Sequence, residues 1–175
     1  MNKKLLATSM IAVLSLPIQA AIAADGTITF TGDITNTTCN ISVNGRNSST
    51  TIVFEPISVS ALSKAGEVAN ELPVTLTLTN CQNPTENVRA LFDSAETDSI
   101  TGNLKNKGSA TNVQVQLMDN ARKPIKLGDG SQANGPSFKI VNELATLDYF
   151  ARYYATDKVE AGDVSTVVNY SLSYF

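Results

Sequence analysis

The chain has 175 residues, a net charge of −3 and no histidine. Its acidic balance, without a cluster of Lys and Arg, argues against a nucleic-acid partner. The lack of histidine removes the usual general base, the usual triad member and the commonest metal ligand. The 16 acidic residues are scattered through turn-like sequence such as Asp93–Asp98, which indicates solvated surface rather than a glycosidase pair. We therefore expect no enzyme, and no catalytic residue, metal or cofactor.

The N-terminus has the pattern of a secretory signal peptide. Two lysines precede a short apolar run, Leu5–Leu16, and the small-residue sequence Ala21-Ile-Ala23 follows. The run is shorter than the roughly 20 residues that a membrane span needs, which disfavours the alternative of an anchor. No later stretch is long enough to span a bilayer. We predict that residues 1–23 are removed on export, which changes the net charge to −5 because Lys3 and Lys4 are lost.

The exported chain begins with an amphipathic strand. Apolar residues and glycines alternate with polar residues over Asp25–Ile34, which is the period of a half-buried β-strand. Such a free strand either fills its own domain or pairs with another molecule, and its periodicity does not decide between the two. Its apolar face consists of Gly26, Ile28, Phe30, Gly32 and Ile34.

The exported part contains two cysteines, Cys39 and Cys81. In an oxidising compartment they are expected to form one disulfide, which would stabilise the fold by roughly 4 kcal/mol in the chain-entropy model. The alternatives are a free thiol or a metal site. Both are disfavoured because the chain has neither histidine nor a Cys-x-x-Cys motif.

The rest of the chain alternates in short segments separated by turn residues, which predicts an antiparallel β-sandwich. Val74, Leu76 and Leu78 should point into its core, and residues 58–67 hold one helical turn at most. The last strand reaches the chain end, so an open edge there would be an aggregation hazard. Strands are expected at residues 37–43, 51–54, 72–81, 88–92, 101–104, 112–118, 124–127, 147–155 and 164–174.

Several of these features together resemble the pilin subunits of the chaperone–usher pathway, which build type 1 and related fimbriae of Gram-negative bacteria. The N-terminal strand is similar to the family's N-terminal extension, and the two cysteines are similar to the family's pair. A mid-chain strand and the C-terminal pattern are similar as well. The residues that carry the resemblance are Gly26–Ile34, Cys39, Asn80-Cys81, Val113–Asp119, Gly162 at the fourteenth position from the end, and the penultimate Tyr174.

The resemblance implies an immunoglobulin-like β-sandwich that lacks its last strand. In the family, a periplasmic chaperone fills the resulting groove, and at the outer-membrane usher the N-terminal extension of the next subunit replaces it. Residues 24–35 would be this donor strand, and residues 36–175 the pilin domain. The donor positions would be Gly26, Ile28, Phe30, Gly32 and Ile34, and the acceptor positions Gly162, Val164, Thr166, Val168, Tyr170, Leu172, Tyr174 and Phe175.

The implied function is that of a structural subunit, exported through the periplasm to a cell-surface fimbrium that supports adhesion. Its partners would be other pilin subunits, in a homopolymer, together with the chaperone and the usher. Three alternatives stay open. The chain could be a minor, adaptor or tip pilin that binds a receptor directly. Ile28 and Phe30 could be ordinary core of a closed sandwich. Gly162 could be a turn glycine, and Tyr174 a plain edge aromatic.

Overall fold

The computed structural model describes residues 29, 31, 38–82 and 86–175. The chain divides into two units, Met1–Asp33 and Ile34–Phe175. The predicted signal peptide and the predicted donor positions lie outside the described residues, so both stay predictions. Every strand of the described residues belongs to the second unit.

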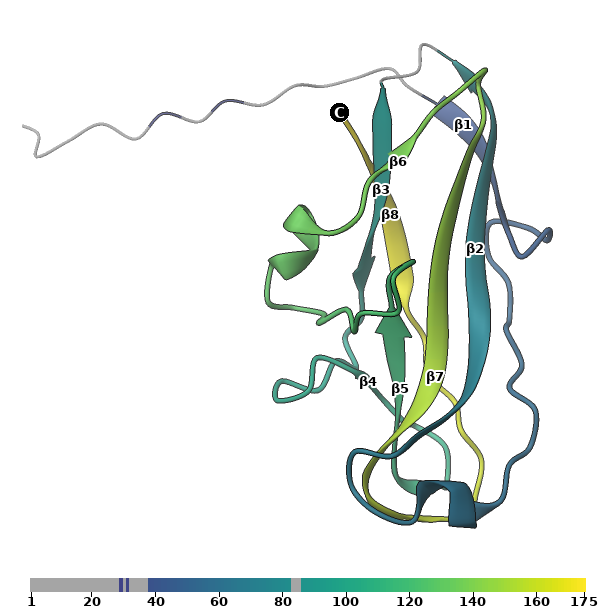
Figure 1. The fold of residues 1–175 in the computed structure, drawn as a ribbon, viewed down its shortest axis with the longest axis vertical. Helices are drawn as coiled ribbons and strands as arrows, with labels where there is room; N and C mark the ends of the chain where they lie inside the picture. Colours follow the sequence, from purple (N-terminus) through teal and green to yellow (C-terminus); the bar gives the residue numbers. More distant parts are fainter. Residues whose placement is uncertain (1–28, 30, 32–37, 83–85) are drawn as a thin grey trace, which may run out of the picture. The chain divides into compact units, whose positions relative to one another are not determined.

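The second unit contains two antiparallel β-sheets (Figure 1). Sheet order is β1-β2-β7-β5-β4 in the five-stranded sheet and β6-β3-β8 in the three-stranded sheet. The elements are β1 (Thr38–Val43), the 3₁₀ turn η1 (Val59–Leu62), β2 (Val68–Gln82), β3 (Asn87–Asp93), β4 (Leu104–Lys105), β5 (Thr111–Met118), the 3₁₀ turn η2 (Ser131–Asn134), β6 (Phe138–Lys139), β7 (Ala145–Glu160) and β8 (Asn169–Tyr174).

The core lies between the two sheets and follows the predicted alternation. Leu76 and Leu78 of β2 are 1% and 0% exposed, and Val74 packs against the same cluster. The sheets meet where the ring of Phe92 on β3 contacts the ring of Tyr149 on β7 edge-on, with centroids 4.9 Å apart. Aromatic pairs favour this geometry, and they bury much apolar surface. The predicted sandwich is therefore confirmed.

Two predicted strands differ from the structure in an informative way. In the part of the chain that the structure describes, neither residues 51–54 nor residues 164–168 pair with a neighbouring strand. The alternating sequence is present in both, because alternation reports which side chains face the core. A strand also needs a backbone partner, and these two segments lack one within the described residues. Their unpaired edges lie on the same side of the sandwich, where both segments line one hollow.

Smaller differences concern strand length. The structure extends β2 and β7 beyond the predicted ranges, and β6 is a short strand that the sequence did not indicate. Residues 124–127 form one bridge, between Met118 and Pro124, where a full strand was predicted. The N–H of Ile125 still donates to the carbonyl oxygen of Leu117 at 2.9 Å, so the predicted turn after β5 is present.

Candidate functional site: a groove along an open sheet edge

Within the described residues, the β8 strand pairs on one side only, with β3. Asn87 and Phe175 exchange two backbone hydrogen bonds, of 2.9 and 3.0 Å, across the β3–β8 ladder. In an antiparallel pair such exchanges recur every second residue, so the odd-numbered residues of β8 direct their N–H and C=O groups toward β3. The even-numbered residues direct theirs to the other side. Among the described residues, no backbone partner is found there from Val164 to Tyr174.

The segment before β8 continues this edge. The carbonyl oxygen of Ser165 accepts from the N–H of Lys107 at 2.8 Å, and that of Val167 accepts from the hydroxyl of Ser94 at 2.7 Å. Lys107 and Ser94 therefore bind these odd-numbered residues on the same side on which β3 pairs with β8. The side chains of Val164, Thr166 and Val168 are half-buried and face the interior. One extended edge therefore runs from Val164 to Tyr174.

A second extended segment, Thr50–Phe54, faces this edge. Ile52 and Phe54 pack against the core, whereas Val53 between them is 75% exposed. The ring of Phe54 stacks on Tyr153 of β7, with centroids 4.5 Å apart. No backbone hydrogen bond of this segment is found within the described part of the chain. The molecule thus has two facing walls, each with free peptide groups.

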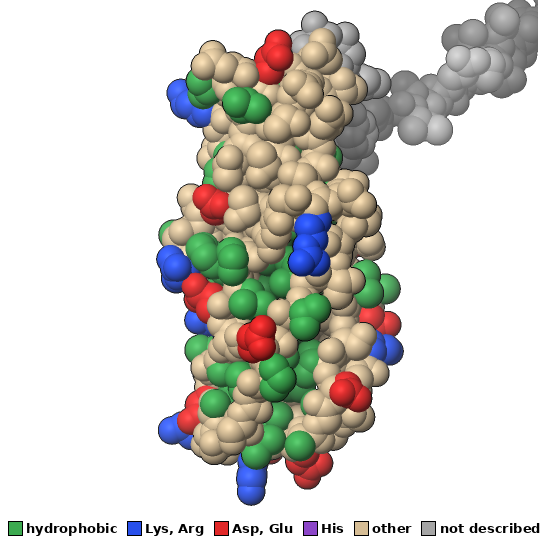
Figure 2. All heavy atoms as spheres, turned by 90° about the vertical axis from the view of Figure 1, so that its right-hand side faces the viewer, with side chains coloured by type: hydrophobic (Ala, Val, Ile, Leu, Met, Phe, Trp, Pro, Cys, Tyr) green, Lys and Arg blue, Asp and Glu red, His purple; other side chains and the backbone are tan. Residues whose placement is uncertain are grey.

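The space between these walls is a groove, which we call the lateral groove. It consists of three adjoining hollows of about 550, 260 and 360 Å³. At one end the hydroxyl of Tyr170 donates to the carbonyl oxygen of Ser48 at 2.8 Å, which connects the two walls. Figure 2, which turns the right-hand side of Figure 1 to the viewer, shows hydrophobic side chains gathered on this face. The floor is formed by Val74 and Leu76 of β2, Phe92 of β3, Val115 and Leu117 of β5, and Ala151 and Tyr153 of β7.

The groove is apolar and largely uncharged. Among the described residues, no charged side chain lines the two hollows beside residues 166–170, and the third hollow has Glu160 and Asp163 in its lining. Burial raises the pKa of Tyr153 and Tyr170, so both stay neutral at physiological pH. Apolar pockets flanked by free backbone donors and acceptors suit an extended peptide that adds a strand. In the described part of the chain, no group of His, Cys, Asp or Glu is arranged to hold a metal.

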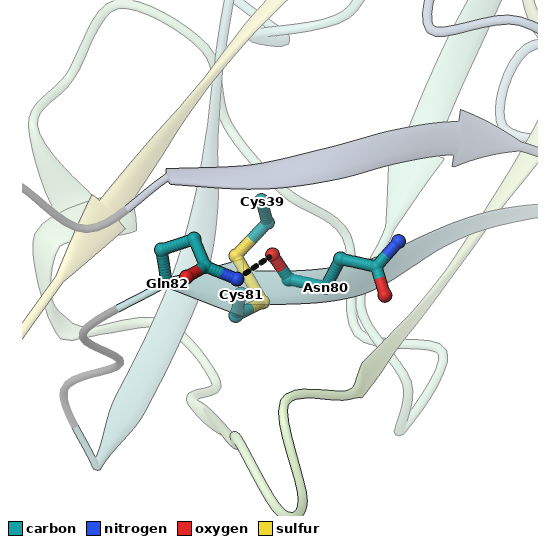
Figure 3. The surroundings of a disulfide bond; sticks show 4 residues. All are labelled: Cys39, Asn80, Cys81 and Gln82. Atoms are coloured by element: carbon teal, nitrogen blue, oxygen red, sulfur yellow. Dashed lines mark hydrogen bonds between the residues drawn. A yellow bond between two sulfur atoms is a disulfide. The ribbon is translucent and has the colours of Figure 1, made fainter.

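The disulfide fixes one end of this side of the sandwich. Cys39 of β1 and Cys81 of β2 are bonded, as predicted, and Cys81 is 1% exposed (Figure 3). The bond holds β1 against β2, and Ile41 and Val43 of β1 line the largest hollow of the lateral groove. The disulfide therefore secures a strand that shapes the groove.

The predicted acceptor residues lie along this one edge, but the two at its ends, Gly162 and Phe175, are exposed rather than half-buried. Gly162 lies at the end of the groove, where a Cβ would come within 2.3 Å of the Ala110 nitrogen, so a close approach requires glycine. Phe175 is 48% exposed, and its ring lies 4.5 Å from the guanidinium carbon of Arg89. The other predicted acceptor side chains are half-buried: Val164, Thr166, Val168 and Tyr170 line the lateral groove, and Leu172 and Tyr174 pack against the core.

Sequence reasoning missed the wall formed by Thr50–Phe54. The alternation of Ile52 and Phe54 with exposed residues predicted a strand, but it gave no sign that the strand would face β8. It named Thr166 as an acceptor position but did not indicate that its hydroxyl would be unusual. The hydroxyl of Thr166 is buried and has no hydrogen-bond partner among the described residues.

Comparison with known proteins identifies the family. The family model described as "Fimbrial protein" matches residues 28–174. The chain belongs to the fimbrial protein family. It is 38% identical to the F17 fimbrial protein of Escherichia coli over 164 residues, which cover 89% of this chain and 90% of that protein. It is 39% identical to the major fimbrial subunit SMF-1 of Stenotrophomonas maltophilia, with 89% and 95% covered.

A solved structure supports the fold. The crystal structure of the P pilus rod subunit PapA matches with a TM-score of 0.57 at 21% identity, covering 85% of this chain and 100% of that one. The predicted all-β, immunoglobulin-like fold and the predicted membership of the fimbrial subunits are thus confirmed. As a fimbrial subunit, the chain belongs to a cell-surface fimbrium and has other subunits as partners. Within the described residues, no helix is long and apolar enough to cross a membrane.

Proposed function

We propose that this fimbrial subunit polymerises head to tail by strand exchange. Its lateral groove accepts the N-terminal strand of a neighbouring subunit, and its own residues 24–35 enter the groove of the next one. The observation that carries the proposal is the open edge from Val164 to Tyr174, whose free peptide groups lie beside an apolar groove. An incoming strand would complete both the hydrogen-bond ladder and the core.

The predicted donor strand suits this groove in size and character. The segment Asp25–Ile34 is about as long as the open edge, and its inward side chains are apolar. Burial of Ile28, Phe30 and Ile34 contributes about 1.5 to 3 kcal/mol for each side chain. Backbone pairing adds to this, so release of a seated strand is slow. A subunit joined in this way needs no covalent link to its neighbour.

Export and assembly follow from the same geometry. An exposed apolar groove with an unpaired edge promotes aggregation, so the subunit needs a partner that covers it before assembly. We assign this role to a periplasmic chaperone, and the exchange of chaperone for donor strand to an outer-membrane usher. The predicted signal peptide, residues 1–23, directs the chain into the periplasm.

We assign the chain to the rod of the fimbria and to no enzymatic role. The relative from Stenotrophomonas maltophilia is named a major fimbrial subunit, and the fold matches a pilus rod subunit. The length of the chain suits one domain.

The test removes the donor strand and leaves the groove intact. The exported chain is produced with its chaperone and usher, with and without residues 24–35, and run on denaturing gels without boiling. The full chain should give a ladder of SDS-resistant oligomers that collapses to monomer on boiling, and the shortened chain should give monomer. The shortened chain must keep its disulfide and its β-sheet circular dichroism as a control. A ladder from the shortened chain would overturn the proposal.

A further inference from the structure

The three-stranded sheet has a second edge, on the side of β3 that faces away from β8. The short strand β6 covers only the start of this edge, opposite Asn87 and Val88. Because the odd-numbered residues of β3 pair with β8, Ala90 and Phe92 direct their backbone groups to the uncovered part. No strand of the described chain pairs with β3 there.

Side chains occupy these backbone groups instead. The hydroxyl of Tyr149 accepts a hydrogen bond from the N–H of Ala90 at 3.2 Å. The side-chain amide of Gln132 binds Phe92 twice, because its Oε1 accepts from the N–H at 2.9 Å and its Nε2 donates to the carbonyl oxygen at 2.9 Å. One amide side chain thus makes both bonds that a residue of a neighbouring strand would make.

Gln132 belongs to η2, which lies across an opening between the two sheets. A guanidinium N–H of Arg89 donates to the carbonyl oxygen of Ala133, which attaches the same turn to β3. Beneath the turn is a hollow of about 300 Å³ whose inner residues include Ala90, Ile125 and Tyr149. Asp119 and Lys123 also line this hollow, so it is more polar than the lateral groove. Without the turn, the hollow would lie beside free peptide groups of β3.

We propose that Gln132 is a specificity-determining residue that prevents β3 from accepting a strand. The inference rests on the strand-exchange function proposed above, and it concerns which edge of the three-stranded sheet accepts the incoming strand. With Gln132 in place, each subunit accepts one strand, at β8, so the polymer grows without branches. Natural β-proteins commonly cover an edge in this way to prevent unwanted pairing. The partner excluded at β3 is an extended peptide with alternating apolar side chains.

The experiment counts strands bound to the mature chain, residues 24–175. The chain is refolded with its disulfide formed, in excess synthetic peptide of residues 24–35, and native mass spectrometry gives the number of peptides per subunit. Gln132→Met keeps the length of the side chain and removes both hydrogen bonds to Phe92. Asn134→Ala, an exposed position of the same turn, is the control. The rate of hydrogen exchange at the Phe92 amide, measured without peptide, shows whether this N–H group is still hydrogen-bonded.

The Gln132→Met chain should bind one more peptide than the wild type. Without peptide, its Phe92 amide should exchange roughly 10-fold faster than in the wild type, because the hydrogen bond to the Gln132 side chain is lost. Asn134→Ala should match the wild type in both. Equal peptide counts for Gln132→Met and wild type would overturn the proposal, whatever the exchange rate. If Gln132→Met fails to fold, Gln132→Glu is used, because a carboxylate still accepts from the Phe92 N–H but cannot donate to its carbonyl oxygen.

The design separates this inference from the proposed function. If the wild type binds no peptide, strand acceptance at the lateral groove is wrong, and the proposed function fails. The difference between Gln132→Met and wild type still measures the β3 edge by itself. If the wild type binds one peptide and Gln132→Met also binds one, the proposed function stands and the role of Gln132 is wrong.

Discussion

The two edges of the three-stranded sheet differ in what binds their backbone groups. Along the edge formed by residues 164–168 and β8, the even-numbered residues from Val164 to Tyr174 leave their peptide groups without a partner in the described chain. Along β3, the peptide groups of Ala90 and Phe92 are bound by the side chains of Tyr149 and Gln132. Both edges border a hollow, which is largely apolar beside residues 166–168 and includes Asp119 and Lys123 beside β3. The two edges therefore differ in their backbone partners as well as in the polarity of the adjoining hollow.

Edge length explains why the two solutions differ. A side chain such as Gln132 can satisfy one residue of a strand, and on β3 only a short stretch beyond β6 needs it. The β8 edge is too long for this, since every second residue from Val164 onward would need its own side-chain partner. Only another strand can satisfy such an edge, because a strand presents donors and acceptors at the same spacing. An open edge of this length is thus a binding surface for a strand.

The largest effect, on the free energy of unfolding, is expected from removing the disulfide that joins β1 to β2. Replacing Cys39 and Cys81 together by serine removes a crosslink with a sequence separation of 42 residues, which constrains the unfolded chain, while β1 stays paired with β2 through its backbone. The chain-entropy model gives a loss of about 4 kcal/mol in the free energy of unfolding. Urea denaturation measures this loss. Reduction of the wild-type disulfide should produce a similar loss, and a change below about 1 kcal/mol in both would show that β1 is held mainly by packing.

A charge in the wall of the lateral groove should weaken strand binding. Ile52→Glu places a carboxylate against the hollows, whereas Val53→Glu places it at a position that is 75% exposed. Loss of the apolar contact of Ile52 predicts at least a roughly 10-fold weaker affinity for the peptide of residues 24–35. Fluorescence anisotropy of a labelled peptide measures it. Similar effects of both substitutions would contradict the assignment of this wall.

The smallest effect on stability is expected at the β3 edge, where side chains bind the backbone groups. Tyr149→Phe removes the acceptor for the Ala90 N–H and should cost about 1 kcal/mol in the free energy of unfolding. Affinity for the peptide at the lateral groove should stay unchanged. Tyr153→Phe is the matched control, since no hydrogen bond of its hydroxyl is found in the described chain. Equal losses of stability for the two substitutions would show that the Tyr149 hydroxyl does not hold the edge.

The same tyrosine predicts a pH dependence. Burial raises the pKa of Tyr149, although the hydrogen bond from the Ala90 N–H opposes the rise. The folded state thus favours the protonated hydroxyl, so this stability is fully present below the ordinary tyrosine pKa and falls as the pH rises above about 10. Tyr149→Phe should remove part of that alkaline loss, which urea denaturation at pH 8 and pH 11 would detect. An unchanged loss would assign it to other tyrosines.

The sequence by itself determined the class of the fold and which side chains face the interior. Alternation with period two identified most strands, and it placed Val164, Thr166, Val168, Tyr170, Leu172 and Tyr174 on one face, as the structure has them. Two cysteines in an exported chain were enough to predict the bond between Cys39 and Cys81. These properties depend on neighbouring residues and on composition, which the sequence displays directly.

Only the tertiary structure decided which edges are open. The segments 51–54 and 164–168 read as ordinary strands, and nothing local shows that each lacks a partner in the described chain. Gln132 lies in a loop rich in Gly, Asp, Ser and Asn, and its partner Phe92 is 40 residues away. Backbone pairing joins residues that are distant in the chain, and the side-chain pattern of a strand is the same whether its edge is paired or free.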